Sequence, residues 1–246
     1  GKKVGLIAND AGRPWRTALA ARLADVIFYT DPNAYVARFP NAVLVPVGVE
    51  VDIFAREERV AKKNSLLFVG RIAPAKHLEN IMSAICRLKR EKTEVLLDVY
   101  GATAIQSDEE YFKNLRSNFA EIERLGLVSY RGAVVHEKTP PIYASHEVFI
   151  HAGSASGFNK ALFEAAASGC LVVTVNPEMR NVVHPDLFVE KLSEETLARA
   201  IKAALTLSRG EREREHAKLR AYVGREHSLS TISGEILENM YPRDKK

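Results

Sequence analysis

Five short apolar runs, rich in β-branched residues, recur along the chain and restrict the folds open to it. They are Leu66–Gly70, Val95–Tyr100, Leu127–Tyr130, Val148–His151 and Leu171–Val175. Each run is too short for a typical helix and is predicted to be a strand buried on both faces. Segments with apolar residues at helical spacing separate them, including 78–88 and 197–205 behind a Ser193 cap. This alternation predicts an α/β fold with a doubly wound parallel sheet.

The first fifty residues carry a smaller set of elements. Strands are expected at Val4–Ala8 and Val26–Thr30, a helix at Thr17–Ala24 and a further apolar run at Val43–Val47. This is too little for an independent domain, so we expect 1–54 to be part of an N-terminal domain with its linker. A charged segment then leads into a Rossmann-like domain over 55–227. Residues 228–246 are expected to form a helix that packs back toward the N-terminal segment. The absence of a starting methionine suggests that residues precede Gly1.

Composition limits the partners and the compartment. The formal charge of +4 and the pI near 9.0 permit anionic partners without choosing among them. Cys86 and Cys170 are expected to be small buried hydrophobes of a reducing compartment, and two cysteines exclude a Cys-type metal site. No uncharged apolar run approaches the roughly 20 residues of a membrane span, and the start lacks a signal-peptide pattern. We expect a cytoplasmic protein and leave peripheral membrane contact open.

A run over 208–227 mixes arginine and glutamate almost evenly. Nucleic-acid binding is one interpretation of such a run. A solvated helix face with internal ion pairs is the other, and it is favoured because the two signs of charge balance along the run. We therefore predict no nucleic-acid partner.

The first candidate for chemistry is the turn Gly70–Lys76, which follows a predicted strand and leads into the 78–88 helix. In a parallel sheet, such a turn lies at the carboxyl ends of the strands, where ligands bind. Gly70 allows a ligand to approach the backbone, the helix start offers N–H groups, and Arg71 and Lys76 add two positive charges. The pattern alone leaves two interpretations open, a diphosphate site or two solvated loop cations.

Glu164 is the second candidate, because it is the only charge between Lys160 and Glu178 and lies in an alanine-rich helix that Gly169 ends. A carboxylate in so apolar a helix needs a partner. One turn from the helix start, it can accept hydrogen bonds from two sugar hydroxyls in the crevice. Alternatively, it pairs with a nearby cation or with the local amides.

Several stretches, taken in order, resemble one known family. The Gly70–Lys76 turn resembles the Gly-Arg-x-x-x-x-Lys loop of retaining glycosyltransferases of the glycosyltransferase-B fold (group 1, family 4 type). Val45–Phe54 is similar to the family's linker, Ser129–Val134 to a strand with its glycine turn, and Tyr143–Val148 to the lead into the next strand. Glu164–Val173 is similar to the Glu-Ala-Met-Ala-x-Gly-x-Pro-Val-Val motif. The resemblance covers roughly 24–241 and identifies the C-terminal donor-binding domain.

The resemblance implies a metal-independent hexosyltransferase that retains the anomeric configuration and uses a nucleotide-diphosphate sugar as its donor substrate, without a cofactor. Arg71 and Lys76 would be the catalytic cations that stabilise the leaving diphosphate. Glu164 would bind the ribose, and the backbone near Val134 would border the base. It also implies that 1–54 is the remnant of the acceptor-side domain, with the acceptor unknown and the rest of that domain or a partner chain missing. The full set of predicted donor-binding residues is Gly70, Val134, Ser156, Gly157, Phe158, Asn159, Lys160 and Glu164.

Three positions depart from the family pattern. Ser156 stands eight positions before Glu164, where the family has a second glutamate, and its hydroxyl brings no negative charge to the sugar. Asn159 replaces a glycine and Lys160 adds a cation, which either contacts the donor or extends into solvent. His77 stands where a glycine is common. His136, after the Gly132 turn, is placed to touch a base or sugar.

Two rivals to the transferase remain. A non-catalytic nucleotide-sugar-binding or scaffolding module is supported by Ser156 and by the missing half. A nucleotide-sugar epimerase of the same fold fits the spacing of Arg71, Lys76 and Glu164 less well.

Overall fold

The computed structural model describes residues 2–9, 12, 15–56, 59–153 and 159–242. Contacts divide the chain into two compact units, the first made of 1–50, 156–160 and 223–246 and the second of 51–155 and 161–222. The boundary that we expected after Phe54 lies after Glu50 instead. The reason is that the Phe54 ring, in the short helix α2 (Val51–Arg56), packs edge-on against two rings of the second unit.

The first unit is a small parallel sheet in the order β1-β2-β3. Its elements are β1 (Gly5–Ile7), α1 (Trp15–Leu23), β2 (Val26–Tyr29), the 3-10 turn η1 (Tyr35–Arg38), β3 (Ala42–Leu44) and the C-terminal helix α10 (Leu229–Met240). Phe28 and Val45 form a buried cluster with Ile232 and Met240, so α10 packs against the N-terminal strands.

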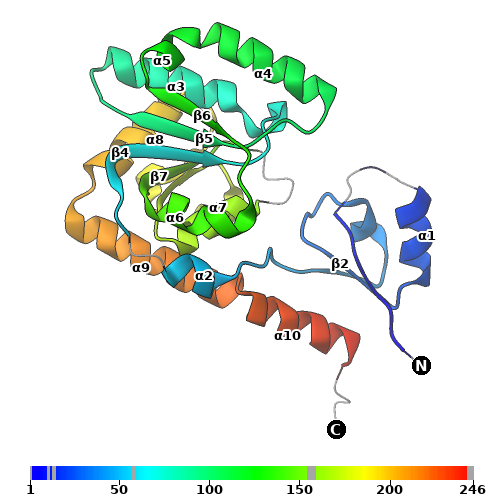
Figure 1. Ribbon diagram of the computed structural model, residues 1–246. Coiled ribbons are helices and arrows are strands. Elements are labelled where there is room, and N and C mark those ends of the chain that lie inside the picture. The colour runs from blue at the N-terminus through cyan, green and yellow to red at the C-terminus, as the bar shows by residue number, and fades with distance from the viewer. Residues whose placement is uncertain (1, 10–11, 13–14, 57–58, 154–158, 243–246) are drawn as a thin grey trace. The chain divides into compact units, whose positions relative to one another are not determined.

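The second unit is built on a five-stranded sheet in the order β6-β5-β4-β7-β8, in which all neighbouring strands are parallel (Figure 1). The strands are β4 (Lys62–Val69), β5 (Leu96–Tyr100), β6 (Val128–Gly132), β7 (His146–His151) and β8 (Leu171–Thr174). Each overlaps one of the five apolar runs, and buried side chains line the three central strands. The predicted doubly wound parallel sheet is therefore confirmed.

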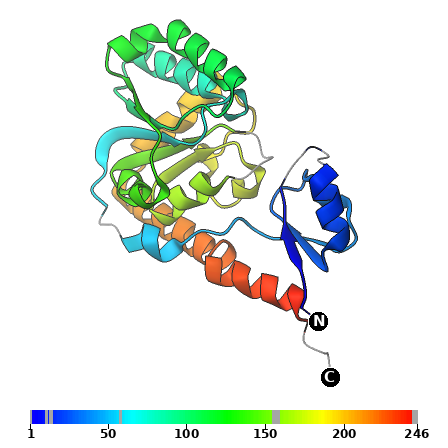
Figure 2. The ribbon, with the colours of Figure 1, turned by 45° about the vertical axis from the view of Figure 1, so that its right-hand side comes forward.

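Helices connect the strands and cover the sheet. They are α3 (Leu78–Arg90), α4 (Gln106–Asn118), α5 (Ala120–Arg124), α6 (Thr139–Ala144), α7 (Lys160–Ala167), α8 (Glu194–Thr206) and α9 (Arg209–Glu226), with 3-10 turns η2 (Pro74–Lys76), η3 (His136–Lys138), η4 (Pro177–Met179) and η5 (Pro185–Leu187). Right-handed crossovers put α3, which packs against α8, on one face and α7 on the other (Figure 2). Ser193 caps α8 in a capping box with Thr196, as its sequence position indicated.

Three glycine turns meet at the carboxyl edge of this sheet. Gly70 N donates to Tyr100 O at 3.0 Å, Gly101 N donates to Gly132 O at 2.8 Å, and the amide of Ile72 donates to the turn after β5. A β-carbon on Gly101 would lie 1.9 Å from the carbonyl oxygen of Gly70. Only glycine allows this approach, which joins the loop after β4 to the loop after β5.

Gly101→Ala is expected to lower the free energy of unfolding by about 3 kcal/mol or more, since its methyl group would overlap a backbone oxygen that cannot rotate away. Gly224→Ala, inside α9 with open space around it, is the matched control and is expected to stabilise by about 0.5–1 kcal/mol. Urea unfolding measures both. An alanine at 101 tolerated within about 1 kcal/mol would contradict the close approach of the two loops.

The charge run forms the helix α9 and is fixed to the second unit by arginines. Arg220 donates from Nε to Ala167 O at 3.1 Å and from Nη2 to Ser168 O at 3.2 Å, which caps the carbonyls at the end of α7. Arg212 pairs with Glu147. His216 lies among these cations, and burial together with the charges of Arg59, Arg220 and Arg212 lowers its pKa to about 4.

This lowered pKa makes the second unit sensitive to acid. In the unfolded chain His216 takes up its proton near pH 6.5, whereas in the folded protein it does so near pH 4, so the unfolded state binds more protons between these values. Stability is therefore expected to fall as pH drops from about 6.5 to about 4, by about 2 kcal/mol after allowance for partial solvent exposure. His216→Gln should flatten that part of the unfolding free energy measured against pH. Parallel curves for the two proteins would refute the assignment.

The two cysteines differ in how deeply they are buried. Both thiols are free, but only Cys170 is buried, while Cys86 is partly accessible, which corrects the expectation that both lie in the core. Cys170 Sγ donates to Tyr143 O at 3.1 Å, and burial raises the pKa of its thiol.

In the portion of the chain that the structure describes, no helix has both the length and the apolar character to cross a membrane. The cytoplasmic location stays a prediction.

Candidate functional site

Two cations meet in the loop after β4, as the sequence indicated. The loop passes through η2, and Lys76 closes it beside the turn after β7, where a β-carbon on Gly153 would lie 3.2 Å from Lys76 Cδ. Burial and the neighbouring positive charge of Arg71 lower the pKa of Lys76. The ammonium is therefore less favourable here than in water, and an anion bound beside it would reverse that effect.

The Arg71 guanidinium is half-exposed, and a buried acid holds one side of it. Arg71 Nε lies 3.7 Å from Asp108 Oδ2, with 55% of the Arg71 side chain exposed and 4% of the Asp108 side chain. Asp108 lies in the first turn of α4 and also accepts the amide of Ala104 at 3.3 Å. The sequence analysis missed Asp108, because an acid in the first turn of a charged helix is ordinarily a solvated residue.

His77 explains why the family pattern has a glycine after the lysine. Its φ of +51° lies in the left-handed region, between the end of η2 and the start of α3. Histidine is sterically disfavoured there, and its ring is held by Glu79, with Nδ1 and Oε1 3.2 Å apart. Glu79 also accepts the hydroxyl of Tyr111 from α4. The departure at 77 is thus accommodated by side-chain contacts.

Glu164 is buried in α7, with both carboxylate oxygens engaged. His136 Nε2 donates to Oε1 at 2.8 Å, and the Tyr143 hydroxyl donates to Oε2 at 3.0 Å. Burial and the carboxylate raise the pKa of the Tyr143 hydroxyl well above its usual value, so Tyr143 stays a donor at any physiological pH. The carboxylate is thus partnered by side chains of the segment after β6, and its role in ribose binding stays a prediction.

Aromatic rings enclose this carboxylate. The Phe54 ring packs edge-on against His136 and against Tyr143, with both pairs of centroids 5.7 Å apart. Tyr143 in turn packs edge-on against Phe149 of β7 at 5.8 Å. This cluster fixes the rotamers of the two donors, and the His136 side chain keeps 37% of its surface exposed beside the carboxylate. A ligand hydroxyl can therefore reach the edge of the cluster at His136.

Tyr143→Phe is expected to lower the free energy of unfolding by about 2 kcal/mol, because it leaves one oxygen of a buried carboxylate without its donor. Tyr111→Phe is the matched control: its hydroxyl bonds to Glu79, whose side chain is 43% exposed, and we expect a loss below about 1 kcal/mol. Urea unfolding compares them. Equal losses would show that the Tyr143 hydroxyl is not bonded to a desolvated charge.

The second unit by itself provides Gly70, Arg71, Lys76, Val134 and Glu164. Arg71 and Lys76 follow β4, and Glu164 lies in the helix after β7, the strand next to β4, so these residues share the carboxyl side of the sheet. Val134 is half-buried in the turn after β6, two residues before His136. Ser156, Gly157 and Phe158 lie outside the described residues. Asn159 and Lys160 group with the first unit, so the roles of all five stay predictions.

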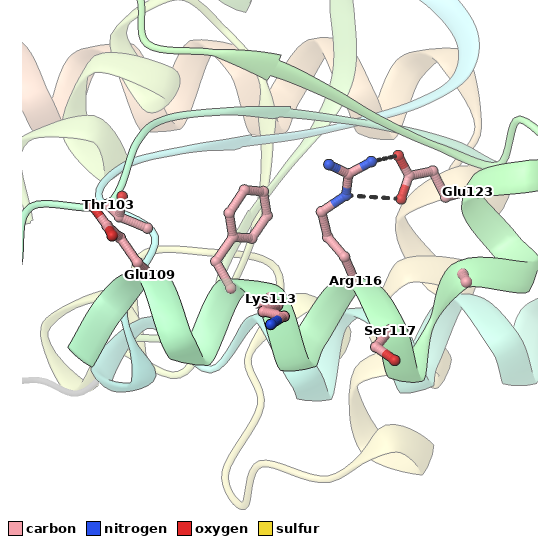
Figure 3. A pocket seen from close by; sticks show the side chains of 8 residues that line it. Thr103, Glu109, Lys113, Arg116, Ser117 and Glu123 are labelled. Carbon is pink, nitrogen blue, oxygen red and sulfur yellow. Dashed lines mark hydrogen bonds and ion pairs between the residues drawn. The ribbon is translucent and has the colours of Figure 1, made fainter. Parts of the chain in front are cut away.

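A separate hollow of about 490 Å³ lies along α4. Figure 3 shows it with the Arg116 guanidinium directed at the Glu123 carboxylate, and Glu109 and Thr103 lie at the other end. Its lining residues are Thr103, Glu109, Phe112, Lys113, Arg116, Ser117, Ala120 and Glu123. None of them was predicted as a site residue, and none belongs to the cationic loop or to the Glu164 cluster.

The strand order, the cationic loop after the central strand and the buried acid after its neighbour define a Rossmann-like α/β domain with two cations at the carboxyl edge of its sheet. The model of the family described as glycosyl transferases group 1 matches residues 63–206, and the chain belongs to that family.

Curated relatives match a similar stretch. The GtfA subunit of the UDP-N-acetylglucosamine–peptide N-acetylglucosaminyltransferase of Streptococcus pneumoniae is 28% identical over 135 residues, which is 55% of this chain and 25% of that protein. The same subunit from Streptococcus gordonii is 27% identical over 135 residues. The chain thus spans about a quarter of the length of the curated relatives it matches.

Solved structures match more of the chain. Anabaena Alr3699/HepE in complex with UDP and glucose has a TM-score of 0.80 at 14% identity, over 98% of this chain and 72% of that one. Pneumococcal O-GlcNAc transferase GtfA in complex with UDP and GlcNAc has a TM-score of 0.63 at 16% identity, over 91% of this chain and 46% of that one. At these identities the likeness shows the fold, and it agrees with the glycosyltransferase-B fold expected from the motifs.

Proposed function

We propose that this chain binds a nucleotide-diphosphate sugar and supplies the donor-side half of a glycosyltransferase that transfers a hexose with retention of configuration. The observation that carries the proposal is the pair of cations in one loop, Arg71 and Lys76, where burial and the charge of Arg71 lower the pKa of Lys76. An anion bound beside these two charges would be stabilised by both of them.

The chemistry follows from the charge that develops during transfer. As the bond between the sugar and the diphosphate breaks, negative charge grows on the leaving nucleotide, and Arg71 and Lys76 would stabilise it without a proton transfer. Glu164 would bind the ribose hydroxyls by exchanging part of its contact with His136, whose half-exposed ring lies at the edge of the cluster. The backbone near Val134 would border the base.

Uridine-diphosphate sugars are the first donors to test. The two curated relatives are named for UDP-N-acetylglucosamine, and both solved structures were determined with UDP. We therefore propose UDP-N-acetylglucosamine as the first donor to test, with UDP-glucose and GDP-mannose as comparisons. The acceptor would be bound by a more complete N-terminal half or by a partner chain, since the chain spans about a quarter of those relatives.

A donor-binding module without transferase activity is the second candidate, and Ser156 favours it. Where the family pattern has a glutamate, Ser156 offers a hydroxyl without charge, which removes one means of stabilising a positively charged sugar centre. Donor binding without transfer, in a protein with both halves complete, would identify this module.

The proposal predicts a specific loss of donor affinity. In calorimetric titrations with UDP-N-acetylglucosamine, Arg71→Ala and Lys76→Ala are each expected to weaken binding roughly 30-fold, because each removes a cation that faces the diphosphate. Arg90→Ala, which removes an exposed cation at the far end of α3, should leave the affinity unchanged. Affinity should also fall as pH rises through the lowered pKa of Lys76, because the ammonium is the binding form. Undiminished binding in both loop variants would overturn the site.

A further inference from the structure

Asp108 is a buried carboxylate that contacts the cationic loop at Arg71. It belongs to the first turn of α4, and its side chain is 4% exposed. Its Oδ2 atom lies 3.3 Å from the Ala104 amide and 3.7 Å from Arg71 Nε. Within the described ranges, it is the only acid at ion-pair distance from Arg71. A carboxylate this deeply buried is favourable only when its partners are fixed.

The contact engages one particular atom of Arg71. A guanidinium has five N–H donors in a planar fork, one on Nε and four on the two Nη atoms. Asp108 faces Nε, so the fork remains available, and 55% of the Arg71 side chain is open to solvent. A carboxylate on the Nε side therefore sets the plane of the group without occupying the donors that suit a phosphate.

The contact between Asp108 and Arg71 also opposes the repulsion between Arg71 and Lys76. Burial and the positive charge of Arg71 both disfavour the Lys76 ammonium, and two like charges at one edge repel each other. The backbone adds to the fixation, because the amide of Ile72 donates to Ala102 O at 2.9 Å in the loop that precedes α4. Asp108 and this loop thus hold Arg71 in place near Lys76.

We propose that Asp108 is the positioning residue of the diphosphate site, which fixes the Arg71 fork for the donor before it binds. This inference rests on the proposed donor-binding function. It predicts a change in donor affinity, on removal of the Asp108 charge, that is opposite in sign to the change expected from electrostatic repulsion alone. A carboxylate near a bound diphosphate repels it, so removing that charge would strengthen binding if Asp108 acted only as a nearby charge. A positioning role predicts that binding weakens.

The experiment is a double-mutant cycle in UDP-N-acetylglucosamine affinity, measured by calorimetry on the 246-residue chain. Asp108→Asn is expected to weaken binding about tenfold, and to have no further effect in an Arg71→Ala background, because the residue acts through Arg71. Glu109→Gln is the matched control: it removes the neighbouring acid of α4, which lines the separate hollow in Figure 3. It should leave the affinity within twofold of wild type. A twofold change is about 0.4 kcal/mol, well below the tenfold effect expected for Asp108→Asn.

A second variant keeps the test valid if Asp108→Asn folds poorly. Arg71→Lys preserves the charge and leaves Asp108 in place, but it lacks both the Nε contact and the fork. We expect it to weaken binding about as much as Asp108→Asn, roughly tenfold. Circular dichroism at the titration temperature confirms that each variant is folded.

The outcomes separate the two proposals. If wild type does not bind, or if Arg71→Ala binds as wild type does, the proposed function fails. If Arg71→Ala loses affinity but Asp108→Asn binds equally or more tightly, only the positioning role is overturned. The same holds if Asp108→Asn causes its full loss in the Arg71→Ala background, since its effect would then not pass through Arg71.

Discussion

The carbonyl oxygen of Gly70 lies where a β-carbon on residue 101 would have to be, and the arrangement of the second unit depends on that approach. It draws the loop after β4 onto the loop after β5, and the amide of Gly101 continues the chain of hydrogen bonds to the turn after β6. The edge of a parallel sheet gathers the turns in one place, but it does not lock them together. Here backbone hydrogen bonds join the loops, so the charged side chains lie on connected backbone.

The buried acids near this edge, Asp108 and Glu164, each have polar partners. Asp108 Oδ2 lies 3.7 Å from Arg71 Nε, and the Glu164 carboxylate is enclosed by the donors of His136 and Tyr143. Each buried carboxylate therefore has its partners before any ligand arrives, as burial of a charge requires. Arg71 keeps 55% of its side chain exposed, so its positive charge remains accessible at this edge of the sheet.

Sequence patterns captured the sheet better than the site. The five apolar runs predicted every strand of the second unit, because strands buried on both faces leave a strong signal; β4 extends back to Lys62 through polar residues that carry none. Arg71, Lys76 and Glu164 were singled out by their motifs, and their roles in donor binding stay predictions. Asp108 was not, because burial of an acid depends on tertiary packing that a charged helix sequence does not reveal. The left-handed backbone of His77 was likewise hidden, since histidine gives no conformational signal where glycine would.

Arg220, which lies beside Gly169, connects the end of α7 to a helix that follows the matched family stretch. Arg220 contacts that glycine and caps the carbonyl groups at the end of the helix that carries Glu164. The stretch similar to the family model ends at residue 206, before α9 begins. A fragment cut at that point would lose Arg220, and water would have to satisfy the last carbonyl groups of α7 in its place. The stretch that matches the family model is thus shorter than the stretch that completes the end of α7.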